Sequence, residues 1–487
     1  MKHKHKFTIL LLAAMEISFI VSAQQNQKPS SSGTATSKPN IVYFLVDNLG
    51  LGELSCYDGG LTRGAMTPRI DKLAEAGMKC WNFAPETQCT PSRSALMTGR
   101  YSIRSGNHTV ALAGSPGGLV TWERTMAEVL SDDGYATSCV GKWHIGASDG
   151  RWPTDNGFDE WYGPAHSYDE ALWAEDPWYE PKRDPISYMY EGVKGQKVKS
   201  TIQLTREVKR DLDVEYMKRS KAFMKKSIEA KKPFFLYFNY TLMHMPNDPR
   251  LEFKGKSGHG EWADCIMQMD ADLGNLVDYL KEIGADKNTI VVFSGDNGPE
   301  YMEPWRGDPG RFSGSYFTGM EGSLRTPCII SYPGKVPANQ ESNEIVHITD
   351  MYTTLINWAG SKVPDDRVID GLDQRSFFEG KQEKSAREGF PYWMGETMYG
   401  VKWQNFKVVF VAKRSFADPE QKLATPWLIN LDVDPKEEKP YDYPYLHTWV
   451  FAHVGKMLNE LNQSIKKEPL IPAGAPLDFV PTGKETK

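Results

Sequence analysis

One cysteine stands in a sequence setting that favours the chemistry of a reactive anion. Cys89 precedes Pro91, which suits the first turn of a helix, and Arg93. The free N–H groups at a helix N-terminus stabilise an anion, and Arg93 is close enough in sequence to reach the same anion. The pattern therefore indicates a nucleophile in an anion pocket. Taken alone, it supports equally well a buried structural cysteine before an ordinary helix.

Two pairs of oxygen-bearing side chains form a second pattern. Asp47-Asn48 follows the apolar run 41–46, and Asp296-Asn297 follows the apolar run 289–293. Carboxylate and amide oxygens favour calcium or magnesium over zinc. Each pair alone is also typical of a turn at the end of a strand. Two such pairs together with the cysteine segment predict a metal site.

The order of elements predicts how these residues meet. Apolar runs typical of buried strands lie at 41–46, 135–140, 234–238 and 289–293. Helical patterns alternate with them at 67–77, 121–134, 204–230 and 266–280. Continuous apolar strands are buried on both faces, as in a parallel sheet, and polar residues recur where these strands end. We therefore predict an α/β domain over 39–388 with its site at the carboxyl edge of the sheet.

The two ends of the chain carry different signals. Residues 1–23 combine a basic start, a short apolar run and the small residues Val21-Ser22-Ala23. They predict a secretory signal peptide, hence a periplasmic or secreted protein without stable membrane insertion after cleavage; an uncleaved membrane anchor is the alternative. Residues 24–38 are rich in Gln, Ser, Thr and Pro and predict a disordered linker. From about 389 short strand patterns and a helix at 449–465 predict a smaller α+β subdomain over 389–487, which ends in a loose polar tail from about Pro472.

The composition excludes some classes of function. The formal net charge is -6, and no basic stripe stands out, so a nucleic-acid partner is not expected. The six cysteines match no zinc spacing. Cys139 and Cys328 lie in apolar strand patterns and are expected to be buried thiols.

The segment from Cys89 to Tyr101 resembles the signature of type I, formylglycine-dependent sulfatases, C-x-P-S-R followed by L-x-T-G-R. These arylsulfatase-like enzymes belong to the alkaline phosphatase superfamily. Further segments along the chain resemble other motifs of that family, at 39–50, 141–146, 294–299, 321–327 and 429–435. The resemblance implies a large mixed, mainly parallel sheet flanked by helices and a C-terminal subdomain built on a short antiparallel sheet.

The resemblance also implies a reaction, the hydrolysis of sulfate esters. In that family a formylglycine-generating or anaerobic maturation enzyme oxidises the cysteine, here Cys89, to formylglycine (3-oxoalanine) before export. One hydroxyl of its hydrate attacks sulfur, and deprotonation of the other then expels sulfate. The substrate would be a sulfated carbohydrate or a small sulfate ester such as an aryl sulfate.

Specific roles follow from the matching motifs. Calcium, with magnesium as second choice, would be held by oxygens of Asp47, Asn48, Asp296, Asn297 and the formylglycine made from Cys89. Arg93 and Lys142 would hold the formylglycine and the sulfate. His144 would take the proton during regeneration, and His244 would contact the sulfate or protonate the leaving group.

The sequence departs from the family pattern at two positions. Asn48 stands where a second aspartate is more common, which removes one negative charge from the metal site. Tyr316 stands where many members have a sulfate-binding lysine. We predict Arg306 as the substrate-binding cation in its place, with Arg311 as a second candidate and His166 and His259 as weaker ones.

Two other functions remain compatible with the sequence. A phosphonate or phosphate ester hydrolase could use the same scaffold and the same modified cysteine. A degenerate relative could bind sulfated glycans without cleaving them, which Asn48 and the missing lysine would favour. The presence of Cys89 and the cationic residues argues against the second alternative.

Overall fold

The computed structural model describes residues 38–112, 114–169, 173, 176–180, 182–183 and 187–481. The predicted signal peptide at 1–23 and all but the last residue of the linker predicted at 24–38 lie outside these residues. Among the residues that are described, no helix has the length and apolarity to cross a membrane.

The large sheet has 11 strands. In spatial order they are β12 (Gln340–Ser342), β2 (Met78–Ala84), β11 (Thr326–Ser331), β8 (Thr289–Gly295), β1 (Asn40–Val46), β7 (Phe234–Tyr240), β3 (Ala136–Val140), β4 (Glu160–Pro164), β5 (Tyr188–Val193) and β6 (Lys199–Gln203), with β13 (Val346–His347) paired to β2 beside this path. The central strands β8, β1, β7, β3 and β4 run parallel, while β11 and β5 join this core antiparallel. The predicted mixed, mainly parallel sheet is confirmed.

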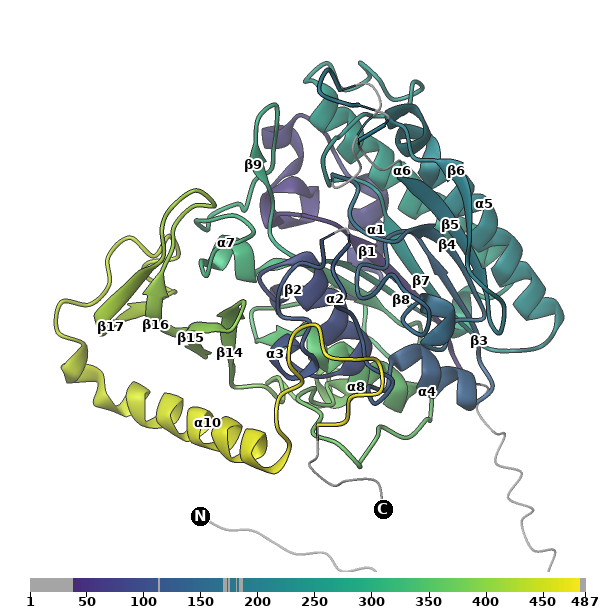
Figure 1. Cartoon of the computed structure of the whole chain (residues 1–487). Helices are drawn as coiled ribbons and strands as arrows, with labels where there is room; N and C mark the ends of the chain where they lie inside the picture. The colour runs from purple at the N-terminus through teal and green to yellow at the C-terminus, as the bar shows by residue number, and fades with distance from the viewer. Residues whose placement is uncertain are drawn as a thin grey trace, which may run out of the picture. The chain divides into compact units, whose positions relative to one another are not determined.

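Both faces of this sheet are covered by helices, which explains the continuous apolar strands (Figure 1). Val42, Phe44 and Val46 of β1 pack on one side with α1 (Pro68–Glu75), α5 (Arg206–Glu229) and α6 (Glu261–Glu282). Ile41, Tyr43 and Leu45 point to the other side and pack with α2 (Cys89–Thr98), α4 (Met126–Asp132) and α8 (Ile348–Trp358). Alternate residues of one strand therefore belong to two different cores.

One predicted helix is shorter than its pattern indicated. The helix expected over 121–134 begins only at Met126. Thr125 caps it: its hydroxyl accepts from the Glu128 N–H at 3.1 Å, and the Glu128 carboxylate accepts from the Thr125 N–H at 2.7 Å. This reciprocal capping box fixes the start of the helix, so the preceding residues stay in a turn.

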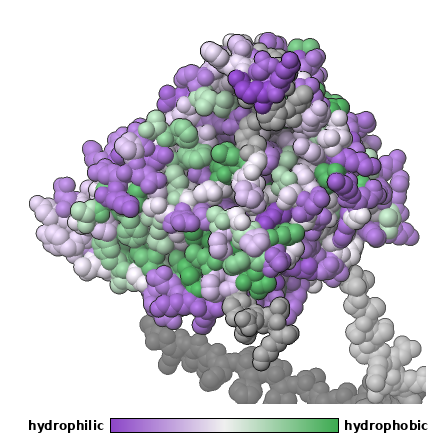
Figure 2. All heavy atoms as spheres, viewed as in Figure 1, coloured by the Kyte–Doolittle hydropathy of each residue, from purple (hydrophilic) through white to green (hydrophobic). Residues whose placement is uncertain are grey.

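A second sheet of four antiparallel strands follows in the chain: β14 (Gly389–Met394), β15 (Thr397–Trp403), β16 (Phe406–Ala412) and β17 (Gln421–Asn430). Helix α10 (Thr448–Lys467) packs on it through Val450 and Val454. The predicted small antiparallel sheet is confirmed, whereas the domain boundary at 389 stays a prediction. On the face shown in Figure 2, hydrophilic residues cover much of the outer rim, and hydrophobic residues gather toward the side of this second sheet.

The remaining short elements lie in connections. They are α3 (Ser102–Ser105), α7 (Glu321–Leu324), α9 (Arg375–Phe378), β9 (Tyr301–Met302), β10 (Trp305–Arg306), and the 3₁₀ turns η1 (Leu51–Glu53), η2 (Ser55–Tyr57), η3 (Gly60–Arg63), η4 (Pro153–Asp155), η5 (Asp286–Asn288) and η6 (Pro444–His447).

The segment after α10 differs from the loose tail that its composition predicted. Up to residue 481 it runs back along residues of the large α/β part of the chain. The Leu477 carbonyl accepts from the Thr121 N–H at 2.8 Å, and the Ala475 carbonyl accepts from Arg151 Nη2 at 2.6 Å. Ile471 and Ala475 are buried with Val120. A few apolar anchors and backbone hydrogen bonds suffice to hold a polar segment, and composition does not reveal them.

Candidate active site

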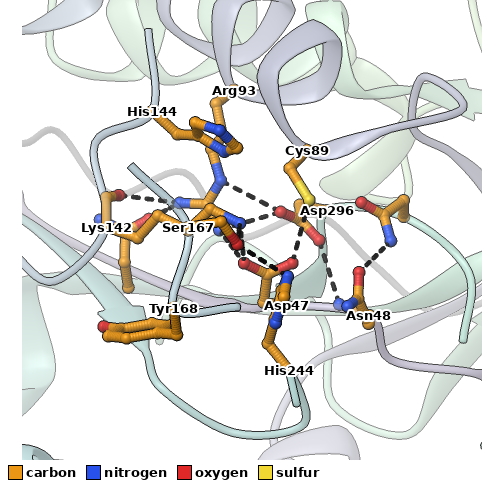
Figure 3. Close-up of polar contacts among 12 residues, drawn as sticks. Asp47, Asn48, Cys89, Arg93, Lys142, His144, Ser167, Tyr168, His244 and Asp296 are labelled. Atoms are coloured by element: carbon orange, nitrogen blue, oxygen red, sulfur yellow. Dashed lines mark hydrogen bonds and ion pairs between the residues drawn. The ribbon is translucent and has the colours of Figure 1, made fainter. Parts of the chain in front are cut away.

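The residues predicted to do chemistry meet at one edge of the large sheet (Figure 3). Asp47 follows β1, Asp296 follows β8, Lys142 follows β3 and His244 follows β7. These four strands are parallel, so their carboxyl ends lie at the same edge. Cys89 is the first residue of α2, and its side chain points to the same place.

Asp47 is the centre of the charge cluster. Its Oδ2 lies 3.0 Å from Arg93 Nη2 and 2.7 Å from Lys142 Nζ, and all three side chains are buried. Its Oδ1 accepts from Cys89 Sγ at 3.3 Å. Burial opposes ionisation, but Lys142, His244 and Arg93 outweigh it and hold the pKa of Asp47 well below its usual range. Asp47 is therefore a carboxylate next to the thiol.

The Arg93 guanidinium is fully engaged with protein atoms. It reaches Asp296 Oδ2 from Nε at 3.1 Å, and its Nη1 donates to the Lys142 carbonyl at 2.9 Å and to Asn239 Oδ1 at 2.7 Å. Its side chain has no exposed surface. These contacts make Arg93 the group that holds both carboxylates in place, and its predicted contact with sulfate stays a prediction.

Cys89 is not set up to act as a thiolate. Its side chain is buried, and burial together with the Asp47 carboxylate raises the pKa of the thiol well above its usual value, against the opposing effect of Lys142. Reactive cysteines lie instead in surroundings that lower the thiol pKa. The unmodified residue is therefore a poor nucleophile in this setting.

The two asparagines complete a group of oxygen atoms. Asn48 has a positive φ of 57° and donates its N–H to Asp296 Oδ1 at 3.2 Å. Asn297 Nδ2 donates to Asn48 Oδ1 at 2.5 Å and to the Gly298 carbonyl at 2.9 Å. Asn297 Oδ1 is buried and accepts no hydrogen bond from any residue that the structure describes.

This arrangement fits a hard divalent cation. Ligand atoms of Asp47, Cys89 and His244 lie within 4.8 Å of one another. Burial and the neighbouring Asp47 carboxylate raise the pKa of Asp296 to about 6, although Arg93 and Lys142 oppose the shift. A cation among these oxygens would relieve that repulsion and would give Asn297 Oδ1 a partner.

His244 is placed to hold and release a proton. Its Nδ1 donates to the Met245 carbonyl at 3.0 Å, and its Nε2 lies 2.9 Å from Ser167 Oγ and 3.6 Å from Asp169 Oδ1. Burial disfavours the charged ring, but Asp169 and Asp47 outweigh burial and raise the pKa of His244. The ring is therefore protonated to a higher pH than an ordinary histidine.

His144 lies on the other side of the nucleophile helix. Its Nε2 is 3.1 Å from the Ala111 carbonyl, and its own carbonyl accepts from Thr90 Oγ1 at 2.9 Å, one residue after Cys89. His166 contacts the same Ala111 carbonyl through Nδ1 at 3.1 Å. The structure thus brings His144 close to the cysteine, while its role in regeneration stays a prediction.

The cation predicted to replace the family lysine, Arg306, has no direct contact with the charge cluster among the described residues. Arg306 is exposed, and its guanidinium lies 4.6 Å from the centre of the Tyr301 ring. Within the described part of the chain, its side chain forms no hydrogen bond or ion pair with the charge cluster. Arg311 pairs with Asp58 at 2.7 Å, and His259 is exposed. Arg306 as a substrate ligand stays a prediction that this geometry does not support.

Tyr316 itself lies beside the site. Its N–H donates to the Pro299 carbonyl at 3.1 Å, two residues after Asn297. The neighbouring Phe317 N–H donates to the Thr87 carbonyl at 3.2 Å, two residues before Cys89. Burial and the acidic groups of Glu300 and Cys89 raise the pKa of Tyr316, so its hydroxyl stays neutral.

Several site residues were missed in the sequence. Ser167 accepts from Lys142 Nζ at 3.0 Å and links it to His244, and Asp169 lies beyond it. Both residues follow the C-terminal end of β4, so a search for polar residues just after each predicted strand would have found them. Glu300, three residues after Asn297, is buried and accepts from Asn48 Nδ2 at 2.7 Å. Burial raises the pKa of Glu300 to about 7.

Comparison with known proteins gives consistent matches. The family profile "Sulfatase" matches residues 39–361, and the profile "N-sulphoglucosamine sulphohydrolase, C-terminal" matches residues 315–464. The chain is 33% identical over 391 residues to N-acetylgalactosamine-6-sulfatase of Canis lupus familiaris, which covers 77% of the chain and 72% of that protein. It is 30% identical over 431 residues to arylsulfatase A of Homo sapiens, with 84% of each protein covered.

A solved structure shows the same likeness in three dimensions. The PsFucS1 sulfatase from Pseudoalteromonas sp. superposes with a TM-score of 0.83 at 30% sequence identity, over 89% of this chain and 92% of that one.

Proposed function

Since the chain belongs to the sulfatase family and is a hydrolase of sulfate esters, we propose that it acts through a formylglycine made from Cys89 and a calcium ion beside it. The observation that carries this proposal is the contact of 3.3 Å between Cys89 Sγ and Asp47 Oδ1, inside a buried set of oxygen atoms. The raised pKa of the thiol supports it as well, because a residue that cannot ionise needs modification to become a nucleophile.

Calcium would be held by Asp47, Asn48, Asp296 and Asn297 together with an oxygen on residue 89. All of these protein donors are oxygens, which calcium prefers, and the buried Asn297 Oδ1 is free to receive it. When present, the hydrated aldehyde supplies the attacking oxygen, and the ion supplies positive charge beside it.

The chain's own residues would then manage charge and protons. Lys142 and Arg93 keep Asp47 ionised and fixed in place. His244 carries a proton on Nε2 and sits in a buried pocket, so it can donate this proton to the oxygen of the departing alcohol. His144 would accept the proton that must leave residue 89 during regeneration.

We propose a sulfated carbohydrate as the substrate. The names of relatives such as N-acetylgalactosamine-6-sulfatase support this class. The structure adds an aromatic group next to the site: the rings of Tyr316 and Phe416 stack with centroids 5.9 Å apart, and Phe416 is 54% exposed. Aromatic faces suit the apolar face of a sugar ring. Export to the periplasm or beyond, and maturation by a separate enzyme before export, complete the proposal.

The main rival substrate is a phosphate or phosphonate ester. A phosphate monoester carries up to two negative charges, and the neutral Tyr316 offers no extra cation to balance the second one. A sulfate ester carries a single charge and fits this site better. The degenerate, non-catalytic reading has little support, since the nucleophile position and the cationic residues are all present and assembled.

The test combines mass and activity on one preparation. The peptide that contains Cys89 should show the mass of formylglycine, and defined mono-sulfated sugars should release sulfate faster than matched phosphate esters release phosphate. An unmodified cysteine in a fully active preparation would rule out the proposed nucleophile. Preferential hydrolysis of phosphate or phosphonate esters would replace the proposed substrate class.

A further inference from the structure

We propose that Glu300 is a positioning residue of the metal site: it keeps the carbonyl oxygen of Asn48 directed at the calcium ion and supplies the negative charge that an asparagine at this position lacks. This inference rests on the proposed calcium-dependent function. Glu300 is not one of the proposed calcium ligands.

The first step is the orientation of the Asn48 amide. An asparagine side chain can turn either its oxygen or its nitrogen toward a neighbour, and only the oxygen binds a cation. Glu300 Oε1 lies 2.7 Å from Asn48 Nδ2, which must donate because an amide nitrogen cannot accept a hydrogen bond. This hydrogen bond holds the nitrogen at Glu300 and leaves Oδ1 as the other end of the amide, which lies at the second asparagine of the metal site and accepts from Asn297 Nδ2 at 2.5 Å.

The second step is the placement of Glu300 itself. Its side chain is 1% exposed, and its other oxygen, Oε2, accepts from the Met245 N–H at 3.4 Å. Its backbone carbonyl accepts from the Gly307 N–H at 2.8 Å. Both carboxylate oxygens thus have protein donors, so Glu300 is held in place to support a ligand rather than to act as one.

The third step is the balance of charge. The carboxylates of Asp47 and Asp296 are matched by the cations of Arg93 and Lys142, which contact them directly. These four side chains sum to zero, so a divalent ion in their midst would be left uncompensated. Glu300 contacts Asn48 and is not itself a proposed ligand; the charge of a bound ion would favour its ionised form, and its carboxylate would then offset part of the ion's charge.

The test is a titration of the full chain with calcium, in which calorimetry measures the affinity. EGTA treatment first removes any calcium already bound. Glu300→Gln keeps the size of the side chain but removes its charge, and its amide can no longer dictate which end of Asn48 faces the ion. We expect this variant to bind calcium about 10- to 100-fold more weakly than the wild type, the usual range for a residue behind a metal ligand. The fraction of modified Cys89 is matched between samples by peptide mass.

A double variant separates positioning from a merely structural role. In Asn48→Asp/Glu300→Gln the ligand carries its own charge and has no amide to orient, so calcium affinity should return to within about 5-fold of the wild type. The single variant Asn48→Asp is measured as well, so that the effects of the two substitutions can be compared separately and together in a double-mutant cycle. Glu303→Gln, an exposed change of the same charge three residues away, should bind calcium like the wild type. Melting curves in EGTA check that each variant folds.

The outcomes are distinct. Wild-type affinity in Glu300→Gln would overturn the inference, and so would a double variant as weak as Glu300→Gln, because the loss would then not act through Asn48. A wild-type protein that binds no divalent cation would overturn the calcium-dependent function as a whole, and this inference with it.

Discussion

The protein contains two groups of buried charges, and they differ in how completely their members satisfy one another. The active-site cluster consists of Asp47, Arg93, Lys142 and Asp296. The second group, here called the junction network, consists of Glu321, Arg325, Lys402, Lys407 and Glu437. Both take charged side chains out of water, which is costly unless opposite charges meet with good geometry.

The junction network closes on itself. Glu321, at the start of α7, lies 2.6 Å from Lys402 Nζ and 3.3 Å from Lys407 Nζ, and Lys407 continues to Glu437 at 2.7 Å. These contacts join the segment before β11 of the large sheet to β15 and β16 of the second sheet. Every charged group of the network faces an opposite one inside it, so its role is to hold the two sheets together.

The active-site cluster is instead left open on one side. Its carboxylates are paired with cations, yet the buried Asn297 Oδ1 has no hydrogen-bond donor among the described residues, and ligand atoms of Asp47, Cys89 and His244 lie within 4.8 Å of one another. The comparison teaches that burial of charge alone does not mark a functional site. What marks it here is a group of neighbouring ligand atoms beside a buried oxygen, Asn297 Oδ1, that no described residue satisfies.

The largest effect should follow from removing the nucleophile position. Cys89→Ala should lower kcat for sulfate release by about 10⁴-fold or more, since the attacking group is lost. Sulfate release from a mono-sulfated sugar measures it. Cys56→Ala, which removes a half-buried thiol in η2, is the control and should keep full activity. An active Cys89→Ala variant would show that the open cluster does not owe its chemistry to this residue.

Removing a carboxylate from the active-site cluster should lower activity more than it lowers the free energy of unfolding. Asp296→Asn removes one of its two carboxylates, so kcat/KM should fall about 10²- to 10³-fold and the remaining activity should require more calcium. Activity measured across a calcium series tests this. Asp278→Asn, an exposed change on α6, should leave both quantities unchanged. Equal loss of activity at all calcium concentrations would contradict a metal role for Asp296.

Removing a carboxylate from the junction network should lower the free energy of unfolding and leave activity unchanged. Glu321→Gln leaves three cations with one carboxylate in a buried place, so the free energy of unfolding should fall by about 3 kcal/mol. The kcat of the folded fraction should stay as in the wild type. Urea unfolding followed by fluorescence measures the loss. Glu341→Gln, which disrupts an exposed pair with Lys79, should change stability by no more than about 0.5 kcal/mol.

The smallest effect concerns pH. Burial opposes the charge on Glu321, but Lys402, Arg325 and Lys407 outweigh it and hold the pKa of Glu321 far below its usual value. The stability from this ionised group is present above the unfolded-state pKa of about 4.5 and is lost as pH falls below it. Between pH 4 and 3 wild-type stability should therefore fall faster than that of Glu321→Gln, by up to about 1.4 kcal/mol per pH unit.

Unfolding curves at pH 5, 4 and 3 for the two proteins test that difference in slope. Parallel slopes would mean that Glu321 does not remain ionised in the folded protein. The junction network would then hold a neutral acid, and the contrast with the active-site cluster would weaken.

The sequence was informative where structure and chemistry depend on neighbours in the chain. The apolar runs that became β1, β3, β7 and β8 were recognisable because burial on both faces leaves few polar positions and no charged ones in them. Asp47, Lys142, His244 and Asp296 could be placed at one edge because parallel strands end together. The start of α4 was missed because it depends on a capping box, and the tail up to 481 because it depends on distant backbone partners.

Sequence alone thus determined the element order, the pairs of oxygen-bearing residues and the special status of Cys89, since each is written within a few adjacent positions. Only the tertiary structure decided that Arg93 pairs with two carboxylates, that Arg306 contacts the Tyr301 ring, and that Glu300 accepts from Asn48, 252 positions away in the chain. The physical reason is that β1 and β8 are neighbours in the sheet but far apart in the chain. Contacts between residues that follow them depend on strand order and register, which no local pattern encodes.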